Sequence, residues 1–203
     1  MNKKVWNHNY AYHKWIIQKI NNNSTILDVG CGDVTLCFKL SSCNKVIGID
    51  TSEDSIKIAN QKNNYNNVSF VNDDYLKYNF KDKYDVIIFV AAIHHMNMEE
   101  ALIKAKSLLN KNGKILIVGL AKPSTIIDNI IELFRVIPNF LISKIKRNKS
   151  SEKLNIQTNY VFPTMNEVRL TIRKVLRNNY KLRQALHYRY LLTWKKNWKT
   201  TCS

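Results

Sequence analysis

Short apolar runs recur along the first 120 residues and are separated by longer stretches of mixed polarity. Each run is four to seven residues long and is nearly free of charged side chains. Runs of this kind are typical of strands that are buried on both faces of a parallel sheet. The predicted strands cover residues 26–29, 46–50, 68–71, 84–90 and 115–119.

The stretches between the runs have the spacing of amphipathic helices. Ser52 is a good N-cap for one helix and Asn97 for another, and Asn112-Gly113 is expected to end the latter. The predicted helices cover residues 6–20, 34–40, 53–61, 98–111 and 165–177, with a further amphipathic stretch over 125–145 that Pro138 interrupts. Strands that alternate with helices predict an α/β fold with a parallel sheet. Residues 180–187 and 189–196 predict two more strands joined by a tight turn.

A glycine turn follows the first predicted strand. Gly30 and Gly32 come directly after that strand, where the backbone must turn sharply and approach a ligand closely. Asp50 ends the second strand, and a carboxylate at that place can accept hydrogen bonds from both hydroxyls of a ribose. The pattern predicts a nucleoside-binding half-fold. A dinucleotide fingerprint would need a third glycine at position 35, where this chain has Thr35.

Asp28 precedes this turn by two residues and suits the ammonium group of an amino acid better than a pyrophosphate. The segment resembles the first motif, D-x-G-x-G-x-G, of class I S-adenosylmethionine (SAM)-dependent methyltransferases, with Val34 in place of the third glycine. The resemblance implies a doubly wound, seven-stranded, mostly parallel sheet (the Rossmann-like methyltransferase fold), whose sixth and seventh strands are antiparallel. It implies one domain over residues 1–203, with 121–163 as a helical cap inserted after strand five.

The resemblance also implies the cofactor, SAM, with S-adenosylhomocysteine (SAH) as its product. Asp28 and the glycine turn would hold the methionine end, Asp50 the ribose, and an acid after the third strand the adenine. Of the two acids there, Asp74 matches the family's position better than Asp73. The expected cofactor-binding residues are Asp28, Gly30, Cys31, Gly32, Asp50, Thr51, Asp73, Asp74, Tyr75 and Val90.

Two histidines follow the fourth strand and face the expected acceptor side. His94 or His95 could take a proton from an acceptor hydroxyl, because an imidazole is a competent base near neutral pH; a capping or packing role is the alternative. In the family, a helix that precedes the sheet often folds over the cofactor. The candidate lid residues are Trp6, His8, Asn9, Tyr12 and His13.

The segment after the fourth strand also narrows the acceptor. Phe89-Val90-Ala91-Ala92 differs from the Asn/Asp-Pro-Pro-aromatic segment of DNA amino-methyltransferases, and no Pro-Cys follows for C5-pyrimidine chemistry. The paired glutamates of protein arginine methyltransferases are also missing from this segment. A small-molecule O-, N- or C-methyltransferase is therefore the first interpretation and an RNA methyltransferase the second. A SAM-binding protein without catalysis is the third.

The charge of +17 is uneven along the chain. Residues 121–203 hold 17 lysines and arginines against 4 acids, whereas residues 1–120 hold 15 against 11. A basic third of this kind suits RNA, an anionic membrane surface or an acidic acceptor, and a merely solvated face is the alternative. The acceptor is accordingly expected to be a small apolar or anionic molecule, and peripheral membrane contact is left open.

The four cysteines form no CxxC pair, and no histidine stands at ligand spacing from them, so no metal site is expected. Reduced thiols suit a cytoplasmic protein. The polar N-terminus does not resemble a signal peptide, and no apolar stretch is long enough to span a membrane.

Overall fold

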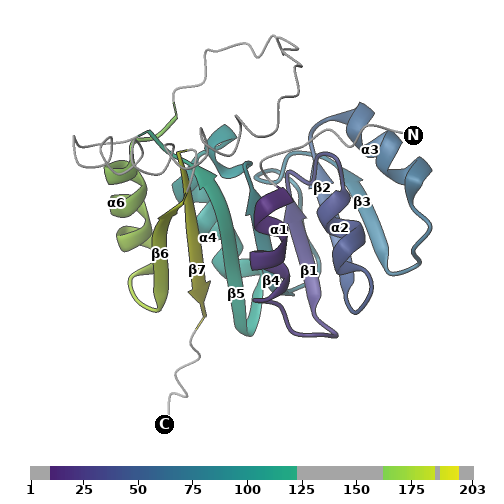
Figure 1. The fold of residues 1–203 in the computed structure, drawn as a ribbon, viewed down its shortest axis with the longest axis horizontal. Coiled ribbons are helices and arrows are strands. Elements are labelled where there is room, and N and C mark those ends of the chain that lie inside the picture. Colours follow the sequence, from purple (N-terminus) through teal and green to yellow (C-terminus); the bar gives the residue numbers. More distant parts are fainter. Residues whose placement is uncertain (1–9, 123–161, 186–187, 197–203) are drawn as a thin grey trace, which may run out of the picture.

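The structure, a computed structural model, describes residues 10–122, 162–185 and 188–196. Its centre is one seven-stranded sheet with the strand order β3-β2-β1-β4-β5-β7-β6 (Figure 1). Strands β1 to β5 are parallel, while β7 runs antiparallel to β5 and β6 antiparallel to β7. The predicted doubly wound sheet with two antiparallel strands is confirmed. The predicted lid residues Trp6, His8 and Asn9 and nearly all of the predicted cap lie outside the described residues.

The strands lie where the apolar runs predict them, with ends that differ by one or two residues except in β5. Each central strand alternates its side chains between two cores, so both of its faces are covered. The strands are β1 (Thr25–Val29), β2 (Lys45–Asp50), β3 (Val68–Asn72), β4 (Tyr84–Val90), β5 (Leu109–Leu120), β6 (Tyr180–Ala185) and β7 (Arg189–Lys195).

Helices cover both faces of the sheet. On the face toward the viewer of Figure 1, α1 (Tyr10–Ile17) and α2 (Thr35–Leu40) pack with α3 (Glu53–Lys62). On the other face, α4 (Met98–Leu108) packs beside α6 (Met165–Leu176), which begins with a capping box. As predicted, Ser52 caps α3 and Asn97 caps α4 through side-chain oxygens that accept backbone N–H groups.

Helix α4 ends at Leu108, earlier than Asn112-Gly113 predicts. Two lysine ammonium groups make three hydrogen bonds to the last carbonyls of the helix, so it needs no glycine to end. Lys83 donates to the Ser107 carbonyl, and Lys196 donates to the carbonyls of Lys106 and Leu109. The chain passes directly into β5, which carries Gly113 within it and shows a register shift between Tyr84 and Val86 of β4.

The two ends of the predicted cap insertion meet. Lys122 donates its backbone N–H to the Pro163 carbonyl at 2.8 Å, and Met165 donates to the Lys122 carbonyl at 3.0 Å. Residues 122 and 163–165 therefore lie side by side at the end of β5, and a cap between them stays a prediction. Among the described residues, no helix has the length and apolar character that crossing a bilayer requires.

Candidate functional site

The carboxyl ends of the parallel strands meet at one edge of the sheet. Strands β1 and β4 are neighbours there, although the chain continues from them in opposite directions, first to β2 and then to β5. Such a topological switch point leaves a crevice at the strand ends, which is where open α/β sheets bind their ligands. The predicted cofactor residues follow β1, β2, β3 and β4 at this edge.

The glycine turn after β1 has two residues with positive φ and one close approach to a neighbouring loop. Gly30 has φ +70°, and a Cβ on it would lie 2.5 Å from the Cβ of Ala92. Gly32 has φ +47°, and a Cβ on it would meet no atom closer than the Gly30 carbonyl oxygen at 3.9 Å. The turn is held by hydrogen bonds from the Gly30 N–H to the Ile49 carbonyl at 2.8 Å and from the Gly32 N–H to Asp50 Oδ2 at 2.9 Å. Glycine is thus required at position 30 on two counts.

Val34 replaces the motif's third glycine and still adopts the left-handed backbone conformation, with φ 56°. This conformation is unfavourable for a β-branched residue. The side chain is only 2% exposed and packs in the core with Leu36 and Leu40 of α2. Burial of an apolar side chain contributes roughly 1.5–3 kcal/mol, which offsets the strain of about 1–2 kcal/mol.

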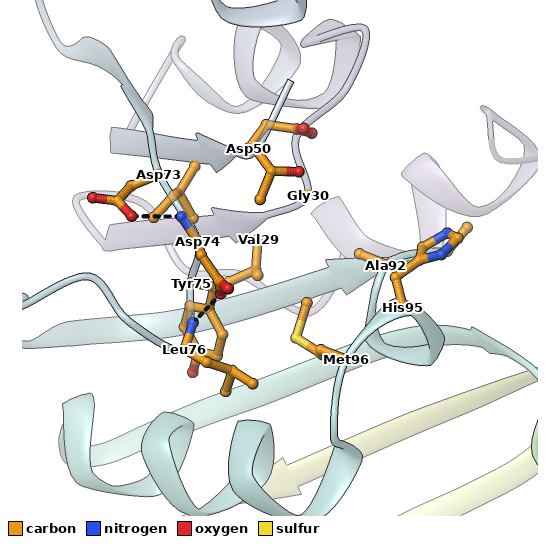
Figure 2. A pocket seen from close by; sticks show the side chains of 13 residues that line it. Val29, Gly30, Asp50, Asp73, Asp74, Tyr75, Leu76, Ala92, His95 and Met96 are labelled. Atoms are coloured by element: carbon orange, nitrogen blue, oxygen red, sulfur yellow. Dashed lines mark hydrogen bonds between the residues drawn. The ribbon is translucent and has the colours of Figure 1, made fainter. Parts of the chain in front are cut away.

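Two adjoining cavities lie at this edge, and the larger of them, drawn in Figure 2, has a volume of about 590 Å³. Asp50 and Gly30 lie on one side of it in Figure 2, while Asp73 and Asp74 lie on another. His95 and Met96 approach from the loop that follows β4. Its lining consists of Val29, Gly30, Ile49, Asp50, Thr51, Asp73, Asp74, Tyr75, Leu76, Ala91, Ala92, His95 and Met96.

The loop after β3 is held by its own carboxylates and by a lysine from α4. Asp73 Oδ1 accepts from the Asp74 N–H at 2.6 Å, and Asp74 Oδ1 accepts from the Leu76 N–H at 2.8 Å. Lys104 donates to the carbonyls of Leu76 and Tyr78 at 2.9 and 2.7 Å. The loop thereby presents both acids to the cavity.

A smaller cavity of about 210 Å³ adjoins the larger one, because Gly30 lines both. Asp28 lies in its wall, is 2% exposed and accepts a hydrogen bond from Cys37 Sγ at 3.2 Å. Burial raises the pKa of Asp28 to about 7, and the charges of Asp33 and Asp50 add to the rise. A cation placed beside Asp28 would favour its ionised form.

Helix α1 closes the smaller cavity. His13 lines it and accepts a hydrogen bond at Nδ1 from Lys39 Nζ at 3.2 Å. Burial, followed by the charge of Lys39, lowers the pKa of His13 to about 4, so the ring is neutral at pH 7. Tyr10 of the same helix donates to Asp33 Oδ2 at 2.7 Å and ties α1 to the glycine turn.

All ten residues expected at the cofactor line one of the two adjoining cavities. The larger takes Gly30, Asp50, Thr51, Asp73, Asp74 and Tyr75, and the smaller takes Asp28, Gly30, Cys31, Gly32 and Val90. Of the described lid candidates, His13 lines the smaller cavity, while Tyr12 packs under the Arg189 guanidinium at 5.8 Å. The sequence analysis missed Tyr10, Asp33 and Met96; of these, only Asp33 had a signal, its place directly after Gly32.

The two candidate histidines, His94 and His95, line different cavities. Their rings are in contact, with centroids 4.0 Å apart and planes tilted by 42°, in the short helix Ile93–His95, but His95 lines the larger cavity and His94 does not. His94 lines a third cavity and contacts Phe162 at 5.0 Å between ring centroids. Burial lowers the pKa of His94 to about 4, and the charges of His95 and Arg189 lower it further. At neutral pH the His94 ring is an uncharged acceptor and donor.

Sequence comparisons relate the chain to methyltransferases. A family model described as a methyltransferase domain matches residues 20–199. An uncharacterised protein of Methanocaldococcus jannaschii is 30% identical over 139 residues, which are 68% of this chain and 51% of that protein. An uncharacterised methyltransferase of Bacillus cytotoxicus is 31% identical over 112 residues, or 52% of each chain. The chain spans about half the length of these curated relatives.

Solved structures share the fold at low sequence identity. The YcgJ protein of Bacillus subtilis superposes with a TM-score of 0.64 and 18% identity, covering 86% of this chain and 71% of that one. The plantazolicin methyltransferase BpumL, determined with SAH and a desmethylPZN analog, has a TM-score of 0.63 and 20% identity, covering 93% of this chain and 81% of that one.

Proposed function

The chain belongs to the methyltransferase family whose domain model it matches over residues 20–199, and from this premise we propose that it transfers a methyl group from SAM to a small-molecule acceptor. One observation carries the proposal. The ten residues expected at the cofactor come from the ends of four strands, and they line two cavities that meet at Gly30. A nucleoside joined to an amino acid would lie across such a pair of cavities, with one part in each.

The residues present suit the parts of SAM. Each oxygen of Asp50 accepts one backbone N–H, from Gly32 or Ser52, which leaves further lone pairs for ribose hydroxyls. Asp73 and Asp74 are the acceptors available to an adenine amino group. Asp28 would face the ammonium group of the methionine part.

SAM supplies an activated methyl group on its sulfonium, so the protein's task is to position the acceptor and to take up its proton. The chain contributes the walls of the cavities and their fixed acceptors. Because Asp50, Asp73 and Asp74 are already oriented by backbone N–H groups, they need little rearrangement on binding.

We expect the protein to bind SAM and SAH in a 1:1 ratio and to show no heat of binding with NAD. The reason is that Asp28 stands where a pyrophosphate would be repelled and Thr35 replaces the dinucleotide glycine. Isothermal titration calorimetry with the three ligands under one set of conditions is the measurement. If the protein binds NAD and shows no heat of binding with SAM, the proposed function is refuted.

Binding of SAH should release a proton below pH 7. Asp28 is partly protonated near its pKa of about 7, whereas the ammonium group of SAH favours the carboxylate. The apparent affinity should therefore rise with pH from about 5.5 to 7, by at most about tenfold per pH unit. His13 stays neutral over most of this window because its pKa is about 4. Calorimetry in two buffers of different ionisation enthalpy measures the released proton.

Asp28→Asn is the control for this pH dependence. The amide has nearly the same shape but no proton to release, so the affinity of the variant should be weaker and flat across the same pH range. If the wild-type affinity for SAH also does not change with pH, then neither Asp28 nor another group at this site releases a proton on binding.

An RNA acceptor is the second candidate, because residues 121–203 carry a net charge of +13 from 17 basic and 4 acidic residues. Tight binding to tRNA that weakens steeply with added salt would favour it, since phosphate contacts release counterions. SAM binding without turnover on any acceptor would instead favour the non-catalytic interpretation.

A further inference from the structure

A third cavity, of about 300 Å³, lies beside the larger cofactor cavity. Met96 lines both, so the two share a wall, while Met98 lines only the third cavity. The loop after β4, the start of α6 and strand β7 all contribute to it. Its volume is at the lower end of the range for ligand pockets, which is about 300–1,000 Å³.

Two buried polar atoms of its lining residues have no hydrogen-bond partner among the described residues: the Tyr190 hydroxyl and His94 Nδ1. Tyr190 as a whole is 1% exposed. Buried polar groups in native proteins nearly always find a partner, so each such exception needs a physical reason. A ligand in this cavity that offers a donor and an acceptor would supply both partners.

Tyr190 is held in place by a close approach of two strands. It pairs with Gly119 across β5 and β7, and a Cβ on Gly119 would lie 2.2 Å from the ring carbon Cζ. The ring can therefore lie across β5 only because residue 119 is glycine. Burial raises the pKa of Tyr190 far above neutrality, so its hydroxyl keeps its proton and can donate.

Most of the remaining lining is apolar, with Ile93 and Pro163 beside an aromatic pair and two thioethers. Phe162 and His94 contact each other with ring planes at 46°, and Met96 and Met98 complete this apolar lining. Aromatic rings and methionine sulfur pack well against a flat aromatic ligand.

The described lining of the cavity holds one charged side chain, that of Glu167. Its carboxylate already accepts from the Thr164 N–H and hydroxyl in the capping box of α6. Arg189, whose charge acts on His94, is not among the lining residues and has its guanidinium over Tyr12. Because the one carboxylate in the described lining is already engaged by Thr164 and no lysine or arginine lines the cavity, the lining favours an uncharged ligand over a carboxylate or an amine.

We propose that this cavity binds the methyl acceptor, and that the acceptor is a small, uncharged aromatic compound with a hydroxyl group. The hydroxyl donates a hydrogen bond to His94 Nδ1 and accepts one from the Tyr190 hydroxyl. The assignment of this ligand as methyl acceptor rests on the proposed function, whereas the binding site itself does not.

Methionine methyl groups report on the two cavities separately. The chain has four methionines, of which Met165 is buried in the core as an internal reference. In protein labelled with ¹³C at the methionine methyls, each assigned by substitution with leucine, SAH should shift Met96 and leave Met98 unchanged. The probe p-cresol should shift both, and toluene, which lacks the hydroxyl, should bind about tenfold more weakly.

Tyr190→Phe and His94→Phe each remove one polar partner and keep a ring in the wall. Each should lower the affinity for p-cresol about tenfold, toward that of toluene, and leave toluene binding unchanged. Because the Tyr190 hydroxyl has no partner among the described residues, Tyr190→Phe should keep or raise the melting temperature. Tyr75→Phe should lower it, since that hydroxyl donates to the Ala101 carbonyl at 3.2 Å.

Equal binding of p-cresol by the wild type and by a folded Tyr190→Phe or His94→Phe variant would overturn the proposal. An unshifted Met98 at saturating p-cresol would do so as well. If Tyr190→Phe does not fold, His94→Phe carries the same test. An unshifted Met96 on addition of SAH, with Met98 responding to p-cresol, would instead refute SAM binding and leave the aromatic site standing.

Discussion

Replacing Gly30 by alanine is expected to abolish cofactor binding and to lower the free energy of unfolding by about 2–5 kcal/mol. The new Cβ would lie 2.5 Å from the Cβ of Ala92, and φ is +70°. Left-handed backbone costs an alanine about 1–2 kcal/mol, and overpacking adds about 1–3 kcal/mol. Relief of the contact must shift the turn or Ala92, and because Gly30 lines both cavities proposed for the cofactor, the shape of both changes. Chemical denaturation and SAH calorimetry measure the two effects.

Three further variants distinguish the backbone strain at Gly30 from the steric overlap with Ala92. Gly32→Ala meets no atom closer than 3.9 Å, so it should cost only the backbone strain of about 1–2 kcal/mol. Ala92→Gly removes the atom that Gly30→Ala would strike. The double variant Gly30→Ala/Ala92→Gly should therefore be more stable than the sum of the single effects, by about 1–3 kcal/mol. Strict additivity would show that the collision with Ala92 is not the cause.

The sequence predicts the sheet and the residues that line the two adjoining cavities at the strand ends well, because both depend on local patterns. Buried strands need apolar runs, and a turn at φ +70° against a neighbouring side chain needs glycine, so Gly30 is visible in the sequence. Asp50 is visible because it directly ends an apolar run. The doubly wound arrangement of the sheet was expected from the family resemblance, since periodicity alone does not fix which strands are neighbours.

What the sequence did not predict depends on contacts between distant residues. The end of α4 is set by Lys83 and Lys196, which reach it from other parts of the chain. The prediction that Asn112-Gly113 ends this helix was therefore wrong. The third cavity brings together His94, Phe162 and Tyr190 from three separate segments, and no spacing rule connects them. His13 was expected at the cofactor through the family resemblance, but its burial and its contact with Lys39 of α2 are tertiary features.

Asp50→Ala is expected to weaken SAH binding by roughly 1–3 kcal/mol, which corresponds to about 5- to 150-fold. The carboxylate has two tasks at the end of β2. Its Oδ2 accepts from the Gly32 N–H and its Oδ1 from the Ser52 N–H, at 2.9 and 3.0 Å, and its remaining lone pairs face the cavity. Alanine removes the proposed ribose acceptor and also the acceptor of the Gly32 N–H in the glycine turn. SAH titration by calorimetry gives the loss of affinity, and chemical denaturation gives any loss of stability.

Asp54→Ala is the matched control, because it removes the same charge from the exposed first turn of α3, away from the cavity lining. It should leave SAH affinity unchanged and cost at most about 0.3–1 kcal/mol of stability through the helix dipole. Asp50→Asn separates the two tasks of the carboxylate. Its one remaining oxygen can serve either Gly32 or Ser52, and its amide must then face the other N–H, so it should bind SAH no better than alanine does. If Asp50→Asn binds like the wild type, the turn needs only one acceptor, and the ribose is held by residues other than Asp50.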